Sequence, residues 1–103
     1  MIDVLLSQIA AEIGGKLIGP DAVIRTVSTD TRHIDSAALF VALVGERFDA
    51  HDFVDQAVTN GAQALLVDHP VDLPVTQLVV TDTKQALGLL GAWIHKQSHI
   101  PTV

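Results

Sequence analysis

The stretch ALFVALVGERFDAHDFVDQAVTNGAQALLVD, residues 38–68, decides the fold class. It opens with a continuous apolar run, ALFVALV, which at this length is typical of a strand covered on both faces, as in a parallel sheet. Phe53 and Ala57 then lie at helical spacing, and Asn60-Gly61 ends the predicted helix. A second apolar run, AQALLVD, completes a strand–helix–strand unit, in which the two strands are expected to be parallel.

Amphipathic patterns on either side of this unit predict two more helices. Near the N-terminus, Leu5, Ile9 and Ile13 lie four apart, as on the buried stripe of a short helix. Gly14 or Gly15 supplies the left-handed residue at which such a helix ends.

The second of these helices is predicted over TKQALGLLGAWIHKQS, near the C-terminus. Leu87, Leu90 and Ile94 form its apolar face. Either Thr81 or Asp82 is placed to cap its first turn.

Short β-branched stretches between the helices predict three further strands. They are KLIG (16–19), AVIRTVSTD (22–30) and TQLVVTD (76–82). The order of elements predicts an α/β fold: a small, three-layer-like domain with a partly parallel sheet, a βαβ unit and about three helices. At 103 residues the chain is expected to be a single domain, residues 1–103.

Composition excludes several classes of function. The net charge is −6 and the six Lys and Arg are scattered, so no basic stripe exists for a nucleic-acid polymer. No apolar run reaches the roughly 20 residues of a membrane span. Cysteine is absent, so neither a disulfide nor a thiolate metal site can form, which fits a cytoplasmic protein.

The first candidate binding segment is STDTR, residues 28–32, at the end of a predicted strand. Thr31 offers a hydroxyl, Asp30 a carboxylate and Arg32 a guanidinium that can pair bidentately with a phosphate. The alternative is an ordinary turn, in which Asp30 bonds its own backbone.

The second candidate segment is GERFDAH, residues 45–51, directly after the apolar strand. Ligands of open α/β sheets gather outside the carboxyl ends of the strands. Arg47 could hold an anion there, Phe48 could stack on a planar ring, and Asp49 begins a helix whose N-terminus favours anions. Alternatively, Glu46 and Arg47 are solvated, and Phe48 and Asp49 only staple and cap the helix.

Neither a metal centre nor catalytic machinery is predicted. His95 and His99 are four apart, but no third ligand lies near them in sequence, and the Glu of a zincin helix is missing. GLLGAW matches neither the P-loop nor the dinucleotide-binding pattern, and no nucleophile–base pair can be argued from spacing.

The ordered set STDTR, LFVALVGERFDAHDF and AVTNGAQALLVD resembles the N-terminal domain of the Mur ligases of peptidoglycan synthesis. Within that family, GERFDAH is most similar to the members that add D-alanyl-D-alanine. The resemblance implies a three-domain, ATP-dependent amide ligase whose N-terminal domain holds the UDP end of UDP-N-acetylmuramoyl-tripeptide. ATP and Mg²⁺ would bind in the central domain, so no cofactor is expected in this chain.

Carried over by position, the resemblance implies a set of UDP-binding residues in the two segments. They are Asp30, Thr31, Arg32, Gly45, Glu46, Arg47, Phe48, Asp49 and His51. Three departures from the family pattern affect loop geometry rather than ligand groups: Ala37-Ala38 in place of Pro-Gly, Ala50 in place of Gly, and Thr31 in place of Ser.

Pro101-Thr102-Val103 reads as the start of a strand, so the chain is expected to be a fragment. The resemblance to the Mur ligases implies that a glycine-rich phosphate loop would follow. The fragment alone should lack ligase activity, and its partners would be the substrate and the remaining domains. The parent ligase would serve bacterial cell shape and division from the cytoplasm. The rival hypothesis is a stand-alone α/β interaction module without a small-molecule site.

Overall fold

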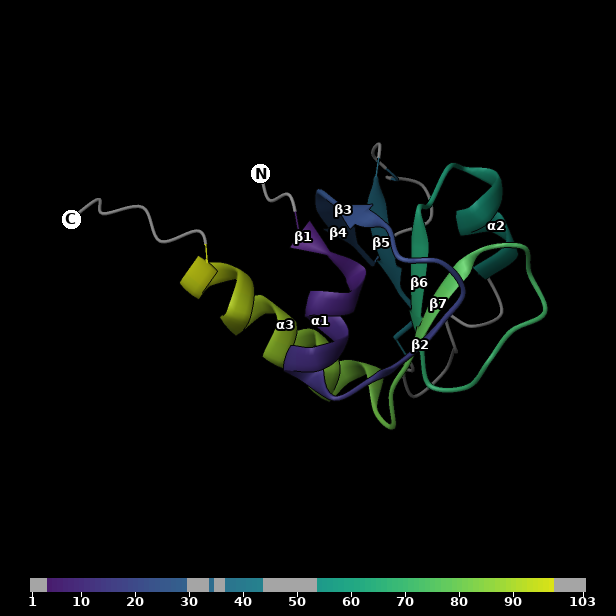
Figure 1. Ribbon diagram of the computed structural model, residues 1–103. Helices are drawn as coiled ribbons and strands as arrows, with labels where there is room; N and C mark the ends of the chain where they lie inside the picture. Colours follow the sequence, from purple (N-terminus) through teal and green to yellow (C-terminus); the bar gives the residue numbers. More distant parts are fainter. Residues whose placement is uncertain (1–3, 30–33, 35–36, 44–53, 98–103) are drawn as a thin grey trace.

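The computed structural model shows a layered α/β molecule, described here for residues 4–29, 34, 37–43 and 54–97 (Figure 1). The elements are β1 (Val4–Leu5), α1 (Leu6–Ile13), β2 (Lys16–Ile18), β3 (Val23–Ile24), β4 (Thr26–Ser28), β5 (Ala38–Val41), α2 (Val54–Thr59), β6 (Ala64–Val67), β7 (Thr76–Val79) and α3 (Thr83–Gln97). Asp49, the predicted cap of α2, and Phe53 lie outside the described residues.

A five-stranded sheet in the order β2-β7-β6-β5-β4 forms the centre of the molecule. The four strands from β4 to β7 are parallel to their neighbours, and only β2 pairs in the antiparallel direction, with β7. The segment 38–68 therefore forms the predicted parallel βαβ unit, and the predicted fold class is confirmed.

Helices cover both faces of this sheet, with α1 and α3 on one side and α2 on the other (Figure 1). Successive residues of β5, and Ala42 directly after it, enter opposite layers: Leu39 and Val41 pack with α1 and α3, whereas Phe40 and Ala42 pack with α2. All four are buried. The uninterrupted apolar run is thus explained by two cores, one on each face.

The stretch 22–30 was expected to be one strand, and the structure corrects this. Its first part, β3, pairs with β1 in a separate two-stranded sheet, and β4 pairs with β5 in the main sheet. The chain passes from one sheet to the other at Arg25, whose N–H donates to the carbonyl of Ala37 at 2.9 Å.

The apolar stripe of α1 also differs from the prediction. Leu6 and Ile9 are fully buried. Leu5, by contrast, precedes the helix and pairs with Val23 in the small sheet, and it is 41% exposed. Gly14 ends the helix in the left-handed conformation, with φ of 76°, as expected.

Asp82 is the residue that caps α3. Its Oδ1 accepts hydrogen bonds from the N–H groups of Lys84 at 2.9 Å and Gln85 at 3.2 Å. Leu90 and Ala86 bury the helix against the core, and Leu87 is half-buried. The side chain of Ile94 lies outside the described part.

Candidate functional site

The carboxyl ends of the parallel strands define one edge of the sheet, and the two predicted binding segments start from it. Ser28, the last residue of β4, pairs with Phe40 near the end of β5. The first segment continues from Ser28, and the second begins four residues after Val41. Because β4 and β5 are neighbours and run in the same direction, the strand ends that precede the two segments lie side by side.

The candidate side chains themselves lie outside the described residues. These are Asp30, Thr31, Arg32, Gly45, Glu46, Arg47, Phe48, Asp49 and His51. What the structure brings together is therefore the pair of strand ends that carry them. Their individual roles stay predictions.

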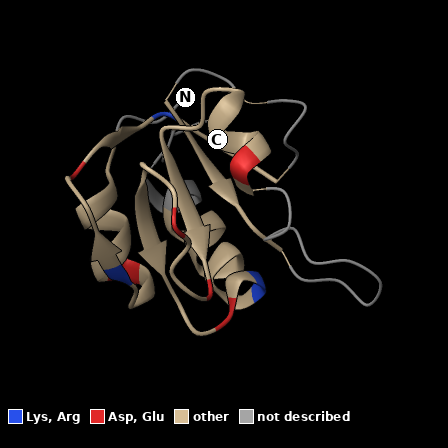
Figure 2. Ribbon diagram, turned by 90° about the vertical axis from the view of Figure 1, so that its right-hand side faces the viewer, with Lys and Arg blue, Asp and Glu red and all other residues tan. Residues whose placement is uncertain are grey.

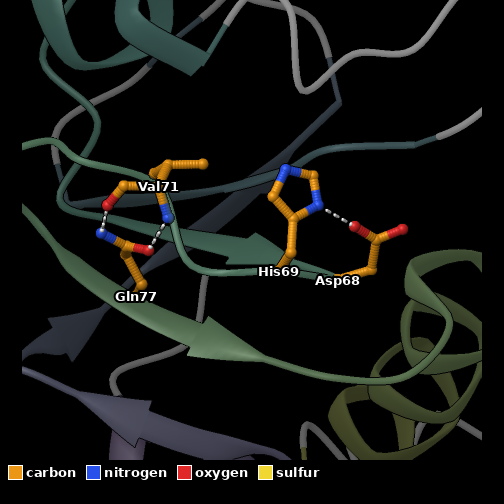
Figure 3. Close-up of polar contacts among 4 residues, drawn as sticks. All are labelled: Asp68, His69, Val71 and Gln77. Atoms are coloured by element: carbon orange, nitrogen blue, oxygen red, sulfur yellow. Dashed lines mark hydrogen bonds and ion pairs between the residues drawn. The ribbon is translucent and has the colours of Figure 1, made fainter.

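The end of β6 adds an acid–histidine pair that sequence reasoning missed. Asp68 and His69 follow Val67 directly, and His69 Nδ1 lies 2.5 Å from Asp68 Oδ1 (Figure 3). The His69 side chain is 55% exposed and that of Asp68 31%. Their position after an apolar strand was the available signal, but only the strand order shows that β6 is the neighbour of β5.

The connection that follows His69 is held by a buried glutamine on β7. The Oε1 atom of Gln77 accepts from the N–H of Val71 at 2.7 Å, and its Nε2 donates to the carbonyl of Val71 at 2.6 Å (Figure 3). Gln77 is only 4% exposed, and these two bonds satisfy its amide. The segment after His69 is thereby fixed to the sheet.

A hollow of about 350 Å³ lies at the same edge, between the end of β6 and the start of α3. It is lined by Asp68, Thr81, Asp82, Thr83 and Lys84. A helix N-terminus in a hollow is a place where an anion can bind. Here, however, the capping carboxylate of Asp82 already occupies the first-turn N–H groups of α3.

The charged residues of the described segments are spread over the chain rather than gathered in one basic region (Figure 2). Lys84 lies at the carboxyl edge, as does Lys16, which pairs with Val79 at the end of β7. Arg25 precedes β4 and therefore lies at the opposite edge. Asp68 and Asp82 accompany the lysines at this edge.

A larger hollow, of about 590 Å³, lies at the amino ends of the strands, opposite the carboxyl edge of the sheet. Its lining comes from the β2–β3 connection, the end of α2 and the start of β7, and includes Asp21, Gln63 and Thr76. Thr76 is engaged, since its hydroxyl donates to the carbonyl of Pro20 at 2.7 Å. Sequence reasoning did not predict this hollow.

Two searches of the described residues gave negative results. Within them, no three His, Asp or Glu side chains come close enough to hold a metal ion together. His95 belongs to α3, but its side chain and all of His99 fall outside the described part. None of the helices in the described segments has the length and apolarity needed to cross a membrane.

An open, mostly parallel α/β sheet with polar segments at its carboxyl edge defines the class of protein, one that commonly binds small ligands there. The family comparison is specific. Residues 23–92, more than half of the chain, match the model described as "Mur ligase family, catalytic domain". The chain belongs to the Mur ligase family and has the fold of its N-terminal domain, which confirms the resemblance inferred from the sequence.

Two of the relatives similar to the chain are named as ligases of D-alanyl-D-alanine. It is 53% identical over 97 residues to UDP-N-acetylmuramoyl-tripeptide–D-alanyl-D-alanine ligase of Escherichia coli, which covers 94% of the chain and 22% of the relative. The Haemophilus influenzae ligase of the same name is 45% identical and covers the whole chain, or 23% of the relative.

A solved structure shares the fold. The crystal structure of MurF from Acinetobacter baumannii superposes with a TM-score of 0.85 at 42% identity, over 94% of this chain and 22% of that one. The chain therefore spans about a fifth of the length of the relatives it matches.

Proposed function

We propose that this chain is the substrate-holding N-terminal domain of an ATP-dependent ligase that adds D-alanyl-D-alanine during peptidoglycan synthesis. In this proposal it binds the UDP end of UDP-N-acetylmuramoyl-tripeptide. The observation that carries the proposal is the parallel pairing of β4 with β5, in the register Ser28 to Phe40. That pairing starts the two family-like segments from one edge of the sheet, where α/β proteins bind nucleotides.

The residue types in the two segments suit the parts of UDP. Arg32 and Arg47 match the diphosphate, because a guanidinium can donate two parallel hydrogen bonds to phosphate oxygens. The hydroxyl of Thr31 is a further donor, and Asp30 shapes the turn that presents it. Phe48 offers an aromatic face on which uracil can stack.

The backbone completes the proposed site. Gly45 would let the chain approach the ligand closely, and Asp49 is the predicted cap of the following helix. Glu46 and His51 supply polar groups beside them. Arginines are needed because the net charge of −6 opposes an anionic ligand at long range.

The chemical step belongs to the rest of the ligase. ATP and Mg²⁺, bound by the remaining domains, would activate the tripeptide carboxylate for attack by the amine of D-alanyl-D-alanine. This chain contributes no catalytic residue in the proposal and positions the substrate through its nucleotide. Its setting would be the bacterial cytoplasm, with effects on cell shape and division.

The proposal is tested by calorimetric titration of the chain with UDP. Arg32→Ala and Arg47→Ala should each weaken UDP binding by about tenfold or more, the usual effect of losing one charge-assisted contact. Arg25→Ala removes the same charge at the opposite edge and should leave the affinity unchanged.

Two results would contradict the proposal. One is the absence of UDP binding by the wild-type chain, which would favour the rival interaction module. The other is equal weakening of UDP binding in all three arginine variants, which would show that the arginines act only through the net charge of the chain.

A further inference from the structure

We draw no further inference here: the strongest candidate, the hollow of about 590 Å³ at the amino ends of the strands, carries none because the Asp21 carboxylate and the Thr76 hydroxyl on its lining are engaged by Ser7 and by the carbonyl of Pro20, and nothing in the described part of the structure shows what ligand would fill it.

Discussion

The carboxylate of Asp21 reaches across 14 residues of sequence to hold the start of α1. It accepts from the hydroxyl of Ser7 at 2.6 Å and from the N–H of Ser7 at 2.9 Å. Leu5, at the N-cap position, has no side chain that could do this. The remote carboxylate therefore satisfies one of the N–H groups that a helix start leaves unpaired.

These bonds make the free energy of unfolding depend on pH in the acid range. The hydrogen bond from the Ser7 hydroxyl, followed by that from its backbone N–H, lowers the pKa of Asp21 from its ordinary value of 3.8. Folding thus favours the ionised form, so its stabilisation is present above pH 3.8 and is lost as pH falls through the lowered pKa. In urea unfolding at a series of pH values, Asp21→Asn should be less stable than wild type at pH 7 and should converge with it in acid.

Ser7→Ala provides the companion variant, because it removes the strongest of these bonds and keeps the carboxylate. It should reduce the acid-dependent part of the stability without abolishing it. A constant difference between wild type and Asp21→Asn at every pH would contradict this account.

Gln77 is the second residue whose role is local and measurable. Gln77→Leu keeps the size of the side chain but leaves the N–H and carbonyl of Val71 without their partners. We expect the free energy of unfolding to fall by about 2 kcal/mol, the effect of two lost bonds at a partly buried site. Gln85→Leu, on the exposed surface of α3, should change it by less than about 0.5 kcal/mol. A similar change in the free energy of unfolding of both variants would contradict the role of Gln77 in holding Val71.

At the scale of elements, the surroundings of Gly15 and Gly88 predict opposite effects on stability when each is replaced by alanine. A Cβ on Gly15 would lie 2.7 Å from Cδ1 of the buried Leu78, whereas one on Gly88 in α3 would meet nothing within 4 Å. Gly15→Ala should therefore destabilise the fold by about 1–3 kcal/mol through overpacking between α1 and the sheet. Gly88→Ala should stabilise it by up to about 1 kcal/mol, since alanine favours the helix.

Thermal unfolding of the two variants against wild type measures this difference. If the midpoint temperatures of both variants shifted in the same direction, Gly15 would not be packed against Leu78 as described.

Helices and strands could be predicted from the sequence where a single pattern of apolar residues determined them. The apolar runs of β5 and β6 required cover on both faces, and the sheet order supplies it. The division of 22–30 into β3 and β4 was not predictable, because its β-branched residues favour a strand throughout. Its break at Arg25 depends on β1, a partner distant in sequence.

At the scale of the whole molecule, the candidate site follows from strand direction. In the sequence, a polar segment follows each of two strands. The parallel pairing of those strands brings their carboxyl ends to one edge of the sheet. Asp68-His69 was missed because an acid and a histidine before Pro70 look like an ordinary turn. Only the strand order shows that they follow the neighbour of β5.

The central claim is that UDP binds at the carboxyl edge of the sheet. The direct measurement is the change in amide chemical shifts when the ¹⁵N-labelled chain is titrated with UDP. The account predicts shifts in the residues that follow β4 and β5, including Arg32 and Arg47, with none at Ala62 or Thr76 beside the opposite hollow. Shifts confined to that opposite hollow, or no shifts up to millimolar UDP, would contradict it.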